Sequence, residues 1–180
     1  QADAKVAIMA ESLKSMTVHG SLYESQINLT QDVDDRIEAF GRLVVKDSVE
    51  LTNIRTVGNV GTVTCGALIS SNIFAGVDNL VTTLPDDAGD FTSLSRLSKL
   101  NVKGLRTLGF SYSGSNVAAW TMGKVNLGVV VIDNGGTLFG LAADAIRLLH
   151  YSNGVEIITL SNLDDPSDTR SDGDAVFRLF

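Results

Sequence analysis

The stretch "GTVTCGALISSNIFAG", residues 61–76, contains the repeating unit that decides the fold. In its first half the apolar residues Val63 and Cys65 stand two apart, with the polar Thr64 between them. Apolar residues at every second position indicate a strand with one buried face. A second short β-rich run, "SNIFA", follows about seven residues later. We therefore interpret the stretch as a coil of two strands.

The same unit recurs as "KSMTVHGSLYESQINL" (14–29) and "GRLVVKDSVELTNIRT" (41–56), and its first strand recurs as "SKLNVKG" (98–104) and "GKVNLGV" (123–129). One alignment column contains the expected inward-facing structural residues Val18, Val45, Cys65, Val102 and Leu127, which are 27, 20, 37 and 25 residues apart. Such spacing is typical of a coil with loops of variable length. A single coil cannot bury its apolar face, whereas stacked coils can. We predict an all-β, parallel β-solenoid (β-helix) of about five irregular coils.

The alternative is an antiparallel β-sandwich built from hairpins. It is less favoured because the connections lack the Asn-Gly and Asp-Gly turns that join paired strands. A column of amides also supports stacking, since the second strands carry Gln26, Asn53, Asn72 and Asn116 at one aligned position. Amide side chains in such a column can hydrogen-bond one another only when successive copies lie directly above each other, about 4.8 Å apart.

Two stretches interrupt the repeat, and we expect loop insertions at about 78–95 and 161–174. The stretch 142–151 fits a short helix or strands equally well. A length of 180 residues suits one core, so we expect a single domain over 1–180. Because the chain begins at Gln1 without a leader, we expect a processed product or a piece of a longer protein.

Charge and composition exclude several classes of partner. The chain has 14 basic and 21 acidic residues and a net charge of −7, which argues against nucleic acid and anionic lipid as partners. No apolar run is long enough to cross a membrane as a helix, so no membrane insertion is expected. One cysteine cannot form an internal disulfide and does not indicate a compartment.

The segments "TMGKVNLGVVVIDNGGTLFGLAADAIRLL" (121–149) and "LSNLDDPSDTRSDGDAVFRLF" (160–180) resemble β-helix segments of very large secreted bacterial surface proteins. The resemblance covers roughly residues 120–180 by cadence and the earlier coils by pattern alone. It implies an extracellular or cell-surface location and a structural or adhesive role. It supplies no catalytic residues.

Few residues are candidates for chemistry. Cys65 shares its column with Val and Leu, so we interpret it as core rather than as a nucleophile. His19 and His150, the only histidines, share no motif and are too few for a zinc site. A carboxylate-rich loop is the candidate Ca²⁺ site, formed by Asp164, Asp165, Asp168, Asp172 and Asp174. Asp86, Asp87 and Asp90 form a poorer second cluster. Otherwise no cofactor is expected.

We therefore expect a non-catalytic structural or adhesive module that forms a stiff scaffold and self-associates or contacts neighbouring coils of the same protein. One alternative is a carbohydrate- or receptor-binding domain of an appendage or phage fibre, with a glycan as ligand. A second is a β-helix enzyme that degrades polysaccharide, which would need converging acidic groups.

Overall fold

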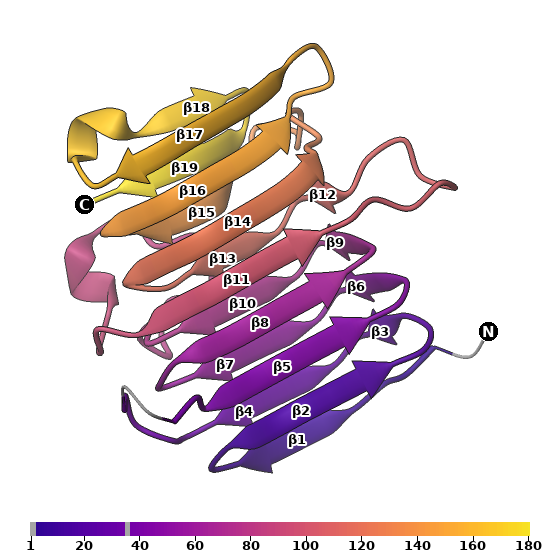
Figure 1. Cartoon of the computed structure of the whole chain (residues 1–180), viewed down its shortest axis with the longest axis vertical. Helices are drawn as coiled ribbons and strands as arrows, with labels where there is room; N and C mark the ends of the chain where they lie inside the picture. The colour runs from indigo at the N-terminus through magenta and orange to yellow at the C-terminus, as the bar shows by residue number, and fades with distance from the viewer. Residues whose placement is uncertain (1–2, 35–36) are drawn as a thin grey trace.

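The structure, a computed structural model, describes residues 3–34 and 37–180 and is all-β, with 55% of residues in strands. The strands form sheets of eight, seven and four members (Figure 1). Neighbouring strands run parallel, except for the pairs β16–β17 and β18–β19 at one end. The antiparallel sandwich considered above does not describe these mostly parallel sheets.

Each of the three sheets consists of the following strands, named in their spatial order across the sheet. The eight-stranded sheet contains β1 (Ala7–Ala10), β4 (Gln26–Leu29), β7 (Asn53–Thr56), β10 (Asn72–Ala75), β13 (Asn116–Ala118), β15 (Phe139–Ala143), β19 (Ala175–Leu179) and β18 (Arg170–Asp172). The seven-stranded sheet contains β17 (Ile157–Leu163), β16 (Ala145–Ser152), β14 (Thr121–Val129), β11 (Arg96–Val102), β8 (Val60–Cys65), β5 (Phe40–Val45) and β2 (Leu13–Val18). The four-stranded sheet contains β12 (Tyr112–Ser113), β9 (Ala67–Ile69), β6 (Ser48–Glu50) and β3 (Leu22–Tyr23).

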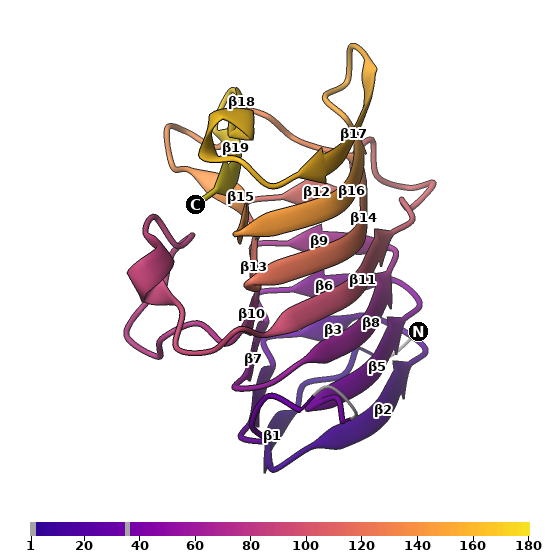
Figure 2. The same ribbon diagram turned by 60° about the vertical axis from the view of Figure 1, so that its left-hand side comes forward.

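The chain visits these sheets in rotation. It passes through β1, β2 and β3, one in each sheet, and then returns to the first sheet as β4 beside β1. One passage through the three sheets is called a round below. Successive rounds ascend from the N-terminal to the C-terminal end (Figure 1), and the two large sheets face each other across the core (Figure 2).

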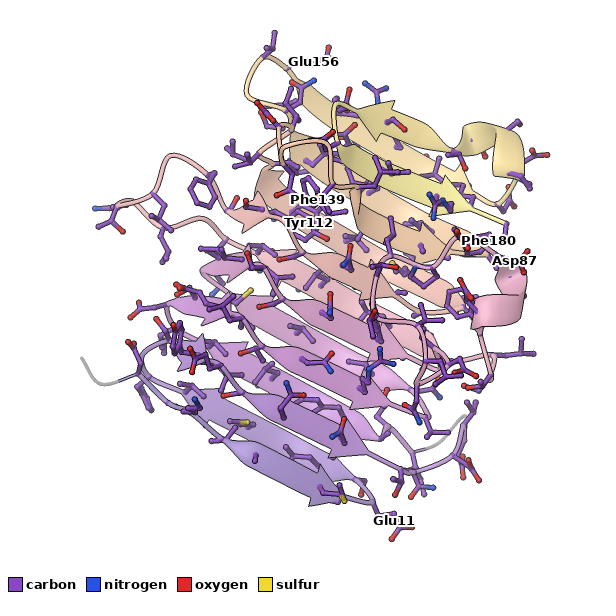
Figure 3. All side chains as sticks on the ribbon, turned by 180° about the vertical axis from the view of Figure 1, so that it is seen from behind. Glu11, Asp87, Tyr112, Phe139, Glu156 and Phe180 are labelled. Carbon is purple, nitrogen blue, oxygen red and sulfur yellow. The ribbon has the colours of Figure 1, made fainter. Side chains whose placement is uncertain are left out.

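Each round contributes inward-facing side chains to one apolar core. In the seven-stranded sheet, Leu43, Val63, Leu100 and Val125 occupy one register column and are fully buried. Near the C-terminal end, the rings of Tyr112 and Phe139 stack with centroids 5.9 Å apart (labelled in Figure 3). This repeated burial is what a single round could not achieve.

The short strands of the four-stranded sheet were not predicted from the sequence. Each has only two or three residues, which is too short to show a period of two. A round therefore contains three strands in its first four copies rather than the expected two. The stretch 142–151, left open between helix and strands, covers the end of β15 and most of β16.

Glycine also has a role within strands, in addition to turns. Gly41, Gly61 and Gly123 lie second or third in β5, β8 and β14. A Cβ atom at Gly123 would lie 2.2 Å from the carbonyl oxygen of Ser98 in the neighbouring strand. A Cβ at Gly61 would lie equally close to the carbonyl oxygen of Gly41. These positions need glycine for close backbone approach.

The predicted insertion at 78–95 packs on the outer face of the eight-stranded sheet. Val77 and Leu84 join Phe74 there in a second, smaller apolar cluster. Phe91 makes edge-to-face contacts with Trp120 and Phe180, each with centroids 5.7 Å apart. The 3-10 turn η1 (Ala88–Asp90) lies in this segment. The insertion therefore covers one side of the molecule.

The two ends of the stack differ. At the C-terminal end, β17 and β18 reverse direction and pair antiparallel with β16 and β19. The expected loop at 161–174 thus contains the end of β17, the 3-10 turn η2 (Pro166–Asp168) and β18. At the N-terminal end, β1 and β2 each have one unpaired edge. Val18 and Leu22 of this round are buried, but its other apolar residues that contact the core are only half-buried: Ala4, Val6, Ile8, Ala10, Leu13 and Met16.

Candidate functional site

Positive charge gathers on the outward side of the seven-stranded sheet. Its seven strands contain no Asp or Glu but six Lys and Arg residues, all exposed. Since the whole chain has a net charge of −7, the residues outside this sheet carry −13. We call this surface the cationic face; it is formed by Lys14, Arg42, Arg96, Lys99, Lys124 and Arg147, and Figure 1 shows the sheet from this side.

A shallow depression of about 320 Å³ lies on the cationic face. Lys99 and Lys124 are register partners on β11 and β14, so they stand about one strand spacing, 4.8 Å, apart at the backbone. Asn101 and Asn126 are also partners, and the Asn126 Nδ2 donates to the Asn101 Oδ1 at 3.0 Å. The depression thus contains two ammonium groups beside a pair of linked amides.

The antiparallel strand β17 completes the depression. His150 on β16 lies opposite Thr159 on β17, and its Nδ1 is 2.9 Å from the Thr159 Oγ1. Leu148, in the same register column as Lys124, contributes the apolar part of the lining. No aromatic ring of a Phe, Tyr or Trp lines the depression. Chemically it offers cationic and amide donors with little area for ring stacking.

The lysines of this site have no acidic partner. Among the described residues, the ion pairs join Lys5 to Glu24 and Arg170 to Glu156 and Asp172, and none includes a residue of the cationic face. Like charges opposite each other on neighbouring strands are destabilising. The pair Lys99–Lys124 therefore costs stability unless an anion from outside neutralises it.

A larger depression, about 430 Å³, lies on the outer face of the eight-stranded sheet and includes Met9, Asn28 and Arg55. Its one cation, Arg55, is already engaged: Nη1 donates to the Asp78 carbonyl at 3.1 Å, Nη2 donates to the Val81 carbonyl, and the guanidinium lies 4.8 Å from the centre of the Phe74 ring. Burial lowers the pKa of Arg55. This arginine fixes the 78–95 insertion, so we consider the smaller depression the better candidate.

A column of hydroxyls stabilises the corner between the four-stranded and eight-stranded sheets. Ser25, Thr52, Ser71 and Ser115 are fully buried, and each donates to the carbonyl two residues before it, at 2.8–3.0 Å. Each also accepts a backbone N–H from the preceding round; for example, the Thr52 N–H donates to the Ser71 Oγ at 3.1 Å. The residue before each hydroxyl has a positive φ: Glu24, Leu51, Ser70 and Gly114. The hydroxyls thus join successive rounds at a backbone corner.

The predicted amide column lies beside these hydroxyls. Gln26, Asn53, Asn72 and Asn116 are register partners in four successive strands. Asn116 Nδ2 donates to the Asn72 Oδ1 at 3.0 Å, whereas the Oδ1 atoms of Asn53 and Asn116 are buried without a partner. Backbone stacking is therefore accompanied by one amide–amide bond among these residues, and the hydroxyls make more of the contacts between rounds.

The hydrophobic column is buried in the seven-stranded sheet. Val18, Val45, Cys65, Val102 and Leu127 all face the core. Leu127 lies at a register irregularity of β14 between Asn126 and Gly128. Cys65 has no exposed surface, and burial raises the pKa of its thiol to about 12. A thiol in this state is neither accessible nor ionised at neutral pH, which is unsuited to nucleophilic chemistry.

The five aspartates of the candidate Ca²⁺ loop have separate surroundings. Asp165 accepts the Ser167 N–H at 2.8 Å, and Asp174 accepts the Asn134 and Gly136 N–H groups at 2.6 and 2.9 Å. Asp172 accepts from Tyr151 and Arg170, while Asp164 and Asp168 are exposed. Over residues 3–34 and 37–180, no three His, Cys, Asp or Glu side chains form a group that could hold a metal ion. Calcium stays a prediction.

The second aspartate cluster caps η1. Gly89 N–H donates to the Asp87 Oδ1 at 2.5 Å, and the Asp87 N–H donates to the Asp90 Oδ2 at 3.4 Å. Such reciprocal contacts form a capping box and use the carboxylates locally. His19 is exposed at the end of β2 and lies outside the depression that contains His150.

No known protein family, curated protein or solved structure matches the chain in the comparisons made. In the described part of the chain, no helix has the length and apolarity needed to cross a membrane. The site residues that sequence reasoning missed are Lys99 and Lys124. The signal was present, because the aligned copies "SKLNV" and "GKVNL" place Lys and Asn two apart at matching positions.

Proposed function

We propose that the chain is a parallel β-solenoid that serves as a non-catalytic structural and adhesive module of a secreted or cell-surface protein. The observation that carries this proposal is the continuous register of backbone and side-chain columns through successive rounds. Repeated rounds that contact only their neighbours form a stiff element whose length grows with the number of rounds. The secreted location rests on the resemblance to bacterial β-helix proteins.

A non-catalytic role is supported by the state of the chemically capable groups. The one thiol is buried with a raised pKa. The carboxylates of both aspartate clusters are dispersed or used as caps. The seven-stranded sheet carries cations and amides rather than paired acids on its outward side.

We further propose that the module self-associates through its N-terminal end. Unpaired strand edges are templates for another strand. The carbonyl of Val6, just before β1, accepts the Gln26 N–H, and the carbonyl of Ala10, at the end of β1, accepts the Thr30 N–H. Because alternate residues of a parallel strand face opposite edges, Ala7 and Met9 direct their backbone groups to the free edge. Met9 itself is 83% exposed.

Light scattering coupled to size-exclusion chromatography tests this interface. We expect the native chain at micromolar concentration to exceed the mass of a monomer. Met9→Pro removes an N–H that faces the free edge and should yield a monomer, whereas Met9→Gln keeps that N–H and should still associate. Circular dichroism checks that both variants fold. A native chain that is strictly monomeric would contradict the proposed self-association.

A further inference from the structure

We propose that the cationic face binds an anionic polysaccharide, with Lys99 and Lys124 contacting its carboxylate or sulfate groups. This role goes beyond the scaffold proposed above and does not depend on self-association. The ligand would lie across the strands, over the depression formed by β11, β14, β16 and β17.

The first argument is the separation of charge. An acidic chain would be expected to neutralise its strand lysines with nearby carboxylates, yet the seven-stranded sheet contains none. The Lys99–Lys124 pair stands in register without an acidic partner in the described part of the chain. An anion placed between the two ammonium groups would relieve their repulsion and form charge-assisted hydrogen bonds.

The second argument is the direction in which the cations follow one another. Arg42, Lys99 and Lys124 belong to one register column that runs perpendicular to the strands, with Thr62 between the first two. Neighbours in such a column are about 4.8 Å apart, so charge repeats along a line. A linear polymer with regularly spaced anions can follow this line, whereas a single small anion would use only one step of it.

The third argument is the chemistry beside the charges. Asn101 and Asn126 supply amide donors and acceptors next to the lysines, which suits the hydroxyls of a saccharide. No aromatic ring lines the depression, so ring stacking cannot supply affinity for a neutral glycan. The surroundings of the sheet carry −13 and repel a polyanion in proportion to its charge density. Duplex DNA, with one charge per about 1.7 Å, is therefore less favoured than a polysaccharide with one carboxylate per sugar.

The test measures binding of the native chain to alginate, dextran sulfate and neutral dextran at physiological salt, by isothermal titration calorimetry. Alginate presents carboxylates and dextran sulfate presents sulfates, so these two arms identify the anion. The site variant is Lys99→Gln with Lys124→Gln. Its matched control is Lys103→Gln with Arg106→Gln, which removes the same charge from two exposed side chains of the loop 103–110 that projects from the stack (Figure 1).

We expect at least one polyanion to bind and neutral dextran not to bind. The site variant should weaken binding about tenfold or more and reduce the slope of log K against log salt by about 1 to 2, as expected for the loss of two cationic contacts. The control variant should lower affinity far less. Circular dichroism and thermal melting should show both variants folded, since all four side chains are exposed.

Three results would overturn the proposal. One is absence of binding to both polyanions by the folded native chain. Another is an equal loss of affinity in the site variant and the control variant, which would indicate only a general charge effect. The third is binding of duplex DNA or of anionic lipid vesicles more tightly than either polysaccharide, which would assign the face to a different class of partner.

Discussion

Removal of the Ser71 hydroxyl is the sharpest test of how the rounds are joined. In the native chain the Ser71 Oγ accepts the Thr52 N–H at 3.1 Å and donates to the Ile69 carbonyl at 2.8 Å. Ser71→Ala removes both contacts. The Ile69 carbonyl keeps a partner, because it also accepts the Leu51 N–H at 3.1 Å. The Thr52 N–H loses its acceptor.

The cost of this substitution follows from burial. Ser71 and Thr52 are each 1% exposed, so water cannot replace the lost acceptor without a local rearrangement. A buried donor without a partner costs about 1–3 kcal/mol. For a chain of this length, each kcal/mol corresponds to a shift of about 2–4 °C in Tm. We therefore expect Ser71→Ala to lower Tm by about 5 °C.

Urea unfolding followed by far-ultraviolet circular dichroism measures the difference in free energy of unfolding. Ser161→Ala is the matched control, since it makes the same chemical change at an exposed position of β17 and should stay within about 0.5 kcal/mol of the native chain. If the two variants were equally stable, the hydroxyl column would not join the rounds, and the reasoning above would be refuted.

Further predictions concern glycine, cysteine, pH and calcium. Gly123→Ala should destabilise the fold by about 2 kcal/mol or more in thermal melting, because its Cβ would meet a backbone oxygen, whereas Gly109→Ala, which meets nothing within 4 Å, should change Tm little. Cys65→Val should cost less than about 1.5 kcal/mol, and the native thiol should react with a thiol reagent only on unfolding. Burial alone would raise the pKa of Asp172, but hydrogen bonds from Tyr151 and Arg170 hold it below 3.8, so Asp172→Asn should lower stability at neutral pH. The loss of stability relative to the native chain should shrink as the pH falls below 3.8 through the lowered pKa of Asp172. Urea titrations at several pH values measure this difference. Calcium binding at 164–174 predicts a higher Tm in millimolar Ca²⁺ than in chelator, whereas carboxylates that stay dispersed, as they are in this structure, predict the same Tm in both.

The sequence was most informative where side chains repeat at inward positions. The column from Val18 to Leu127 could be predicted because burial in every round demands an apolar residue at the same place. Likewise, Asn72 and Asn116 could be aligned although 44 residues separate them, and they are register partners. Insertions change the distance along the chain but leave the column intact, so alignment of copies is a better guide than spacing.

Other features could not be predicted because they leave no periodic signal. The strands of the four-stranded sheet are too short to alternate. The positive φ at Leu51 and Ser70 could not be predicted from the sequence, because residues other than glycine occupy these corners. The role of the hydroxyls was obscured because Ser71 and Asn72 are adjacent and both bond to a neighbouring round, Ser71 to the Thr52 N–H and Asn72 to the Asn116 amide. Only the geometry shows that the hydroxyl contacts continue through more rounds than the amide contacts.

The candidate site was hidden for a different reason. Sequence inspection weighed residues by catalytic or metal-binding chemistry, and Lys99 and Lys124 belong to neither class. The two lysines form a pair only because the parallel register of β11 and β14 places residues 25 positions apart side by side. It also depends on the absence of acids from a whole sheet, which can be counted only when the strands of that sheet are known.

The unequal ends of the stack have a consequence for how the molecule comes apart. When each round contacts only its neighbours, local opening spreads from whichever end is held least. Most apolar side chains of the first round are only half-buried, which makes the N-terminal end the weaker one, while the reversed strands β17 and β18 cover the other end. Amide hydrogen exchange should therefore be graded along the axis, fastest in β1 and β2. Under tension applied at the N-terminus, the chain should unwind round by round, so that a load is released in steps instead of in one rupture.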